Sequence, residues 1–179
     1  IICIELFLRM TENKTIRFSS HPYVNYIGTP NYKSADGLSM HNSLGMRGPE
    51  ITVPKPQGRI RIAIIGGSTV YEEFVKDWRK DFARQLEREL KQVYPNKDIE
   101  AINAGLPGWD SWNDLVNLEF RLIDLDLDMI IVYEGVNDVH ARMVKPAAYK
   151  SDDSGNIIQW GRNPCTILLC FSIVQRMIQ

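Results

Sequence analysis

The sequence predicts an α/β protein with a parallel β-sheet. Three short apolar runs, rich in Ile and Val, alternate along the chain with segments of helical periodicity. Each run ends in a loop that contains glycine, which is typical of a strand that leaves its sheet in a tight turn. Strands that alternate with helices form parallel sheets through right-handed crossovers. We therefore expect the three runs to lie side by side and to end at one edge of the sheet.

The composition is that of an ordinary globular protein. The chain has 179 residues, of which 44% are hydrophobic and 24% charged, so a single domain can bury a core. The net charge of -1, with no basic cluster, gives no reason to expect a nucleic-acid partner. Cys3, Cys165 and Cys170 form no Cys-x-x-Cys pair. We expect them to be small buried side chains rather than a disulfide framework or a metal site.

The first ten residues form a short apolar segment. Ile1–Met10 is apolar apart from Glu5 and Arg9, and it is too short to span a bilayer. It fits the end of a membrane helix or signal region whose beginning is missing, and equally a buried or frayed N-terminal helix. On the first interpretation the protein is extracytoplasmic or membrane-anchored, with a membrane tether through the missing N-terminal segment.

Residues 11–58 are expected to form an irregular arm that precedes the α/β domain at 59–179. The arm has no sustained periodicity and contains several prolines, which favours short extended pieces joined by turns. Within it, His41–Gly48 is dense in polar side chains and turn formers. This segment could be a loop near a functional site, but an ordinary surface connection is the favoured interpretation.

The first predicted strand, Ile60–Ile65, is followed by Gly66, Gly67, Ser68 and Thr69. In open α/β sheets, ligands and catalytic groups collect at the carboxyl ends of the strands. A serine directly after such an end, beside glycines that let a substrate approach, is a candidate nucleophile. Turns rich in Gly and Ser are also common without any catalytic role, so this loop alone does not identify an enzyme.

A helix is predicted over Asp77–Tyr94. Its apolar residues recur every three or four positions, so they share one face that we expect to be buried. These residues are Trp78, Phe82, Leu86, Leu90 and Val93. Asp77 is the expected N-cap, and Pro95 ends the helix.

The second predicted strand, Ile99–Asn103, leads into the loop Ala104–Asp110. The pattern Ser111-x-x-Asp114 resembles a capping box that opens a helix through Ile123. Apolar residues cover most of the circumference of this helix, so we expect it to be well buried.

The third predicted strand, Asp128–Tyr133, is followed by the loop Glu134–Asp138. Residues Pro146–Arg162 are polar and rich in Gly and Asp, and they predict a loop. Asn163–Pro164 is a suitable start for a final apolar segment, Cys165–Ile178. This segment is shorter than a membrane span, and we expect a core or interface helix.

The three strand-end loops carry complementary chemistry. Ser68 offers a hydroxyl, Gly108 can present a bare backbone N–H, and Asn137 has an amide NH₂ that can donate to an oxyanion. Acyl transfer needs such a set, because negative charge builds on the carbonyl oxygen during nucleophilic attack. If the three loops converge, these residues predict a serine-based acyl-transfer site.

The loops also resemble the sequence blocks of the SGNH (GDSL-type) hydrolases. Gly66–Thr69 resembles the first block, Asn103–Gly108 the second and Gly135–Asp138 the third. Their order and spacing agree with the family, and the resemblance covers about Arg59–His140. Three blocks in order, each at a strand end, are a much more specific signal than any one of them.

The resemblance implies a three-layer α/β/α sandwich with a flavodoxin-like parallel sheet. It implies that Ser68 is the nucleophile and that its own N–H, the Gly108 N–H and the Asn137 side chain form the oxyanion hole. Asp138 would brace the Asn137 loop rather than take part in the chemistry. The arm segment Asn42–Arg47 also resembles the stretch that precedes the first block in some bacterial members.

Two features depart from the family pattern. The Asp that usually precedes the serine is replaced by Gly67. The family also carries its general base as a His with an Asp three residues before it, and none of His21, His41 and His140 has such an Asp. His140 would have to fold back to reach Ser68, so a surface or loop-packing histidine is the favoured interpretation. We expect that the chain is truncated before the Asp-x-x-His block.

The predicted function is hydrolysis of carboxylic esters, as in an esterase, lipase or deacetylase. Ser68 attacks the ester carbonyl, Gly108 and Asn137 stabilise the oxyanion, and a histidine outside this chain carries the proton. Water then releases the acyl-enzyme. The substrate would be a small-molecule, lipid or glycan ester, and no metal or organic cofactor is implied.

Two alternatives stay open. An O-acyltransferase on glycan or lipid would use the same residues, with a sugar hydroxyl in place of water. A non-catalytic carbohydrate- or partner-binding module would keep the sheet without the catalytic histidine. Nucleotide binding is disfavoured, because Gly66–Tyr71 lacks the Gly-x-Gly-x-x-Gly spacing and no Walker-type Gly-Lys-Ser/Thr occurs.

Overall fold

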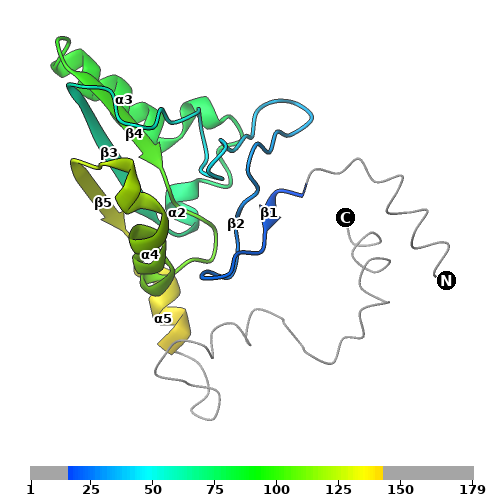
Figure 1. Cartoon of the computed structure of the whole chain (residues 1–179). Helices are drawn as coiled ribbons and strands as arrows, with labels where there is room; N and C mark the ends of the chain where they lie inside the picture. The colour runs from blue at the N-terminus through cyan, green and yellow to red at the C-terminus, as the bar shows by residue number, and fades with distance from the viewer. Residues whose placement is uncertain (1–15, 143–179) are drawn as a thin grey trace, which may run out of the picture. The chain divides into compact units, whose positions relative to one another are not determined.

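A three-stranded parallel sheet forms the centre of the protein in the computed structural model, which describes residues 16–142 (Figure 1). The strand order is β4-β3-β5. The bounds are Arg59–Gly66 for β3, Asp98–Asn103 for β4 and Met129–Tyr133 for β5. Both neighbours pair with β3 in parallel. The predicted parallel α/β arrangement of these three runs is therefore confirmed.

Several predictions fall on parts of the chain outside the described residues. They are the apolar segment 1–10, the loop 146–162, the final apolar segment 165–178 and the side chain of His140.

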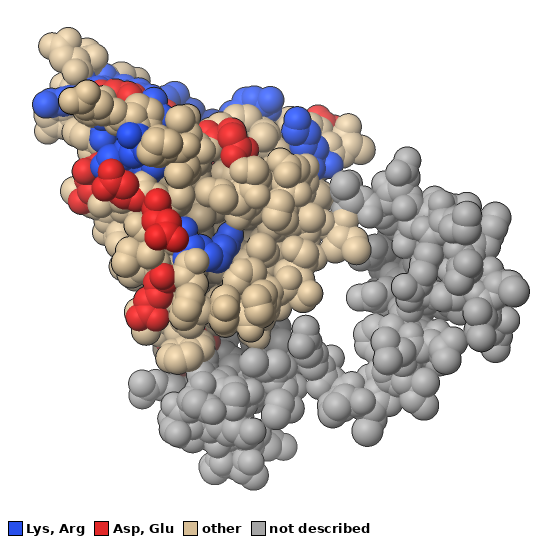
Figure 2. Space-filling view, in the orientation of Figure 1, with Lys and Arg blue, Asp and Glu red and all other residues tan. Residues whose placement is uncertain are grey.

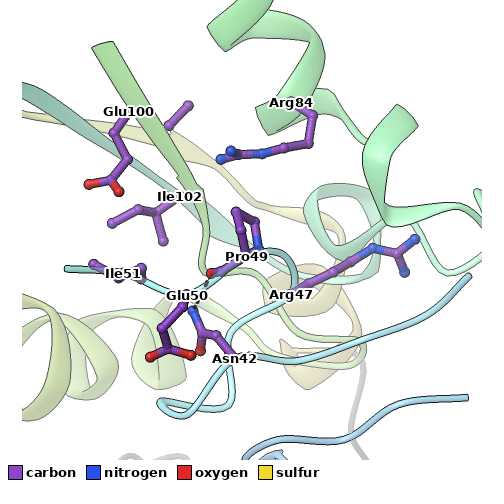
Figure 3. A pocket seen from close by; sticks show the side chains of 9 residues that line it. Asn42, Arg47, Pro49, Glu50, Ile51, Arg84, Glu100 and Ile102 are labelled. Atoms are coloured by element: carbon purple, nitrogen blue, oxygen red, sulfur yellow. Dashed lines mark hydrogen bonds between the residues drawn. The ribbon is translucent and has the colours of Figure 1, made fainter. Parts of the chain in front are cut away.

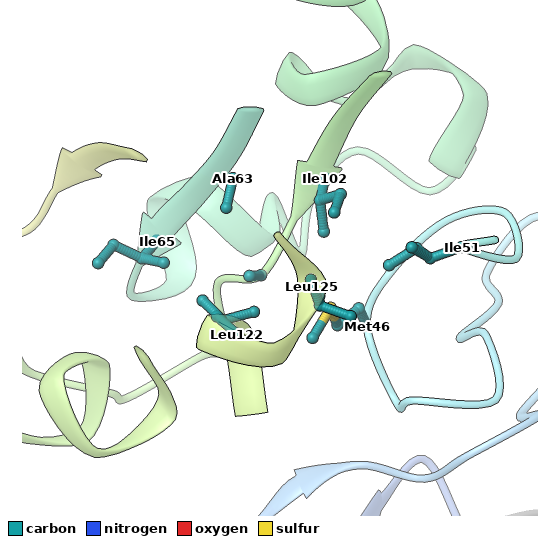
Figure 4. Close-up of a cluster of buried hydrophobic side chains, with 8 residues drawn as sticks. Met46, Ile51, Ala63, Ile65, Ile102, Leu122 and Leu125 are labelled. Carbon is teal, nitrogen blue, oxygen red and sulfur yellow. The ribbon is translucent and has the colours of Figure 1, made fainter. Parts of the chain in front are cut away.

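The two faces of β3 are both buried, which explains its uninterrupted apolar sequence. One face carries Ala63 and Ile65 into a core cluster that includes residues from β4, the arm and the segment after α4 (Figure 4). Its members are Met46, Ile51, Ala63, Ile65, Ile102, Ala104, Leu122 and Leu125. The opposite face carries Ile64 into a second cluster with Val70 and Ala83. Helical segments therefore cover the central strand β3 on both sides.

The first predicted helix is two separate helices in the structure. A 3₁₀ turn, η1, spans Trp78–Lys80, and the α-helix α3 spans Phe82–Val93. Asp77 caps η1 by accepting from the backbone N–H of Arg79. Asp81 caps α3, and its extended backbone separates the two. The prediction of one helix from Asp77 is wrong because Asp81 is a second, buried N-cap.

The apolar face predicted for this helix is only partly buried. Phe82 is 42% exposed and Val93 is 66% exposed. Ala83 is fully buried and Leu86 packs against the same cluster, so the helix contacts the sheet along these two residues. Because Ala83 is small, the helix packs close to β4. Phe82 and Val93, at the two ends of the helix, remain in solvent.

The second predicted helix is also divided. The α-helix α4 spans Ser111–Asn117, the π-helical turn η2 spans Leu118–Leu122, and the 3₁₀ turn η3 spans Ile123–Leu125. The predicted capping box does not form. Asp110 is the N-cap and accepts from the backbone N–H of Asn113 at 3.1 Å.

The helix α4 buries mainly polar side chains, with Val116 as its one buried apolar residue, so the apolar burial predicted for it is only partly present. Trp112 is 52% exposed, whereas Asn113, Asp114 and Asn117 are buried. Asn113 Nδ2 donates locally to Asp110 Oδ1 at 2.6 Å, whereas Asn117 Nδ2 donates to the Ala104 carbonyl of the β4 loop at 3.5 Å. The periodicity of apolar residues in the sequence does not reveal such hydrogen-bond partners.

The arm has the irregular structure that was predicted, with two-residue strands β1 (Phe18–Ser19) and β2 (Ile27–Gly28) that pair antiparallel. The favoured interpretation of His41–Gly48 as a surface connection is wrong, because most of this segment is buried. Asn42 Oδ1 accepts from the backbone N–H of Met46, and Arg47 forms a β-bridge to Asn103. These interactions place the segment against the outer side of β4.

The opposite edge of the sheet is more open. Strand β5 has β3 as its one neighbour among the described strands, and most of its side chains are exposed. The helix α5, Val136–Arg142, follows it. No helix within residues 16–142 has both the length and the apolar character that crossing a bilayer requires. On the face shown in Figure 2, basic side chains are interspersed with acidic ones.

Candidate functional site

The carboxyl ends of the three strands meet around Gly67. Because of the sheet register, Ile64 lies opposite Asn103 on one side and Ile131 on the other, so the strands end at similar heights. The backbone N–H of Leu106 donates to the Gly66 carbonyl at 3.0 Å. Asn137 Nδ2 donates to the Trp109 carbonyl at 2.5 Å. Loops that are far apart in the sequence are thus joined by direct hydrogen bonds.

Gly67 lies at the centre of these contacts. A Cβ atom at this position would lie 2.6 Å from Asn137 Nδ2 and 3.0 Å from the Trp109 carbonyl oxygen. Groups from the β4 loop and from the β5 loop therefore both lie against the residue that precedes Ser68.

Ser68 is the first residue of α2, a four-residue helix that spans Ser68–Tyr71 directly after β3. Its side chain is exposed, and its hydroxyl has no hydrogen-bond partner among the described residues. Val70 and Tyr71, at the other end of the same helix, are fully buried. The C-terminal half of α2 is therefore fixed in the core, while its first residue exposes the Ser68 hydroxyl to solvent.

A buried hydrogen-bond chain anchors Tyr71. The phenol oxygen lies 2.8 Å from His41 Nε2, and it accepts from Arg17 Nε at 2.9 Å. His41 Nδ1 lies 3.2 Å from the Thr29 carbonyl. Since a carbonyl only accepts, Nδ1 carries the proton and Nε2 accepts from Tyr71. Burial lowers the pKa of His41 to about 4, so the ring is neutral at pH 7.

A second buried connection holds α2 to the sheet and to α3. Asn103 Nδ2 donates to the Val70 carbonyl at 2.8 Å and to Asp81 Oδ2 at 3.1 Å. Arg47 Nε lies 3.8 Å from the same Asp81 oxygen, with both side chains buried. The N-cap of α3, the end of β4 and the arm therefore meet beneath the helix that carries Ser68.

Gly108 lies in the β4 loop next to Trp109. It adopts φ +74°, a left-handed conformation that favours glycine. A Cβ atom here would lie 3.1 Å from the hydroxyl oxygen of Tyr26. That hydroxyl donates to the Pro107 carbonyl, and burial raises the pKa of Tyr26 to about 12, so it stays protonated. The arm thus fixes the peptide whose N–H is the candidate oxyanion donor.

Asn137 lies in the first turn of α5 and is half-buried. One of its two amide protons is used in the bond to the Trp109 carbonyl. An amide NH₂ has two donors, so the second proton remains for another acceptor. The bond to Trp109 fixes the direction of the carboxamide.

Asp138 joins α5 to the start of α4. Its Oδ1 accepts from the backbone N–H of Ser111 at 3.2 Å and also from the Ser111 hydroxyl. Asp138 therefore braces the loop that carries Asn137 through a contact with the β4 loop, in agreement with the role implied by the family resemblance.

Acidic side chains gather at this edge of the sheet. Asp114 is buried, and both of its carboxylate oxygens lack a hydrogen-bond partner within the described part of the chain. Burial, and secondarily the nearby carboxylates of Glu134, Asp110 and Asp138, raise the pKa of Asp114 to about 7, against a smaller, lowering effect of the Gly66 backbone N–H. Such buried, strongly perturbed carboxyl groups occur preferentially at functional sites.

The described histidines do not supply an evident general base. Both ring nitrogens of His41 are engaged, with Thr29 and Tyr71. His21 Nδ1 accepts from the backbone N–H of Tyr23 at 3.4 Å. Burial, and secondarily the charge of Arg121, lower the pKa of His21. Only the backbone of His140 is described, as part of α5.

A separate pocket lies between the arm and β4 (Figure 3). It has an empty volume of about 230 Å³, part of which is open to solvent. Its lining includes Arg84, Glu50 and Glu100 but none of Ser68, Gly108 and Asn137. In Figure 3 the side chain of Arg84 extends toward Glu100, whereas that of Arg47 extends in the opposite direction. This pocket is therefore distinct from the strand-end site.

Sequence reasoning missed several residues that build the site, namely His41, Tyr71, Asp114 and Glu134. The capping pattern gave Asp114 a local role that it does not have. The density of polar residues around His41 was the one available signal that this segment is more than a surface turn. No group of three His, Cys, Asp or Glu side chains in residues 16–142 is arranged to hold a metal ion.

Comparison of the chain with models of known protein families and with curated proteins finds no match.

Proposed function

We propose that the chain is a serine hydrolase of the SGNH (GDSL) type that cleaves carboxylic esters. The observation that carries this proposal is the convergence of Asn137 Nδ2 and the Trp109 carbonyl on Gly67, the residue that precedes the exposed Ser68. The parallel order β4-β3-β5 supports a flavodoxin-like sheet within a three-layer α/β/α sandwich, in which ligands bind at the carboxyl ends of strands.

In the proposed reaction, Ser68 Oγ attacks the carbonyl carbon of an ester. The oxyanion accepts from the backbone N–H groups of Ser68 and Gly108 and from the free amide proton of Asn137. The serine proton passes to a histidine and then to the leaving alkoxide, and water hydrolyses the acyl-enzyme in a second cycle. The role of His41 in this proposal is to fix Tyr71, since both of its ring nitrogens are occupied.

The test is to replace Ser68 by Ala in the full-length protein. We expect hydrolysis of short- and long-chain p-nitrophenyl esters to be lost, while the circular dichroism spectrum and the unfolding midpoint stay unchanged. Labelling by a fluorophosphonate probe should disappear in the same variant. Retained turnover in Ser68→Ala would reject the assignment.

One observation favours a non-catalytic binding module instead. Asn137 is already hydrogen-bonded within the protein, and both ring nitrogens of the buried His41 are engaged. The fluorophosphonate probe distinguishes the two functions, because it reacts with an activated serine and not with an inert hydroxyl. A full-length protein that neither labels nor hydrolyses esters would favour the binding module.

A further inference from the structure

The space beside Gly67 is filled by side chains from a neighbouring strand end. A Cβ atom at position 67 would lie 2.6 Å from Asn137 Nδ2 and 2.9 Å from Glu134 Oε2. Gly67 has φ -80°, which any residue can adopt. Glycine is therefore needed here for space and not for backbone conformation.

Glu134 holds the start of α5 in place. Its Oε1 accepts from the backbone N–H of Gly135 at 2.9 Å. The backbone N–H of Asn137 lowers the pKa of the Glu134 carboxylate, against the larger, raising effect of burial. Glu134 thus holds the residue that precedes α5, the helix from whose first turn the Asn137 side chain projects.

The second oxygen of Glu134 has no such partner. Oε2 is buried and accepts no hydrogen bond from the described residues. It faces the same point beside Gly67 as Asn137 Nδ2 does. A buried carboxylate oxygen without a donor is costly, and such groups persist mainly where function retains them.

We propose that Glu134 is a positioning residue of the candidate site, which fixes the Asn137 carboxamide against the turn that carries Ser68. It acts through two contacts, the backbone N–H of Gly135 directly before α5 and the space at Gly67. This inference rests on the proposed function, because the group it positions is the candidate oxyanion donor. Glu134 itself has no contact with the reacting atoms in this assignment.

The first test compares Glu134→Ala and Glu134→Gln in the full-length protein. With p-nitrophenyl acetate as substrate, we expect kcat to fall about 10–100-fold in Glu134→Ala, because a displacement of about 1 Å in a catalytic group costs this much. KM should stay within about threefold, since the ground state gains little from the oxyanion donor. Glu134→Gln keeps the shape and should retain more activity than the alanine variant. Glu119→Gln removes an exposed charge elsewhere and is the matched control.

The outcomes decide the inference. A selective loss of kcat, with an unfolding midpoint close to that of the unmodified protein, supports positioning. Unchanged kcat in both Glu134 variants overturns it. A loss that comes with a large fall in the unfolding midpoint and a loss of the folded far-UV spectrum also overturns it, since Glu134 would then be a general stability residue.

A second measurement does not require any activity. Gly67→Ala should lower the unfolding midpoint by about 5 °C, and the same substitution in a Glu134→Ala background should lower it by clearly less. Equal losses in the two backgrounds would show that Glu134 does not fill the space at position 67. If the unmodified protein neither hydrolyses esters nor reacts with a fluorophosphonate, the proposed function fails, while this coupling still reports on the packing of Glu134.

Discussion

The two ends of the central sheet differ in how fully their buried charged side chains are hydrogen-bonded. At the amino end, Arg61 is fully buried and all three of its guanidinium nitrogens are hydrogen-bonded. Nε donates to Glu100 Oε2 at 2.5 Å, Nη1 to the Leu125 carbonyl at 2.6 Å, and Nη2 to the Thr52 carbonyl at 2.8 Å. Asp128 Oδ2 accepts from the backbone N–H of Arg61 at 2.7 Å. This end joins the arm, the sheet and η3, and each nitrogen of the buried guanidinium donates one hydrogen bond.

At the carboxyl end, Asp81 and Asp110 are buried with hydrogen-bond partners, but two other acidic residues have buried oxygens without one. Both oxygens of Asp114 and one oxygen of Glu134 lack a hydrogen bond from the described residues. The acidic neighbours raise the pKa of these groups further instead of compensating them, after the larger effect of burial. The amino end therefore has the character of a structural anchor. The carboxyl end keeps uncompensated polarity beside the exposed Ser68, which is the usual arrangement at a functional site.

The strongest test of this contrast is removal of the buried charge at the amino end. Arg61→Met leaves the buried Leu125 carbonyl, the Thr52 carbonyl and Glu100 Oε2 without the donors that Arg61 supplies, so we expect a loss of about 3–5 kcal/mol in the free energy of unfolding. Arg59→Met is the matched control, because Arg59 pairs with Asp98 and Glu100 at the surface and should cost about 1 kcal/mol or less. Urea denaturation measures both values. Similar losses in the two variants would show that the buried guanidinium of Arg61 contributes no more to stability than the surface guanidinium of Arg59.

At the carboxyl end, removal of a charge should instead stabilise the protein. The folded-state pKa of Asp114 is raised to about 7, above its value in the unfolded chain. The folded state therefore binds the proton more tightly, and stability falls as pH rises through the interval from about 4 to about 7. Asp114→Asn has no such titration, so its stability relative to the unmodified protein should increase by about 2–4 kcal/mol from pH 4 to pH 8.

Unfolding free energies at several pH values test this expectation. Asp124→Asn removes an exposed carboxylate and serves as the control, with little change in pH dependence expected. If the difference in unfolding free energy between Asp114→Asn and the unmodified protein is constant from pH 4 to pH 8, then Asp114 is already ionised at low pH. The contrast between the two ends of the sheet would then weaken.

The smallest expected effect concerns the brace between the loops. Ser111→Ala removes the hydroxyl that donates to Asp138, and we expect a loss of about 1 kcal/mol because the contact is exposed. The same substitution in an Asp138→Ala background should cost almost nothing, since the partner is already absent. Additive losses in this double-mutant cycle would show that the two side chains do not interact in solution.

The sequence predicts the parts of this fold that depend on local pattern. The β-branched run Ile62–Ile65 identifies the central strand, because only a strand buried on both faces is apolar without interruption. The position of Ser68 at a strand end followed from the same run. The parallel order of strands then brought its loop next to the loop of Asn137.

Features that depend on distant partners could not be predicted in this way. Asp81 is an N-cap because Arg47 and Asn103 surround it, whereas Asp77 is an equally good cap by local sequence. His41 is buried because Tyr71 offers it a hydrogen bond across the fold. Glu134 has no special local signature, and its relation to Gly67 exists only after β3 and β5 have paired.

The open side of β5 has a practical consequence for handling the protein. Met129, Val132 and Tyr133 are all more than half exposed along a strand with one described neighbour, so this edge is a template for strand addition between molecules. The well-exposed carboxylate of Asp126, just before the strand, is the charge best placed to oppose such association, although it also pairs with Lys55. Solubility should therefore fall when this carboxylate is neutralised by acid.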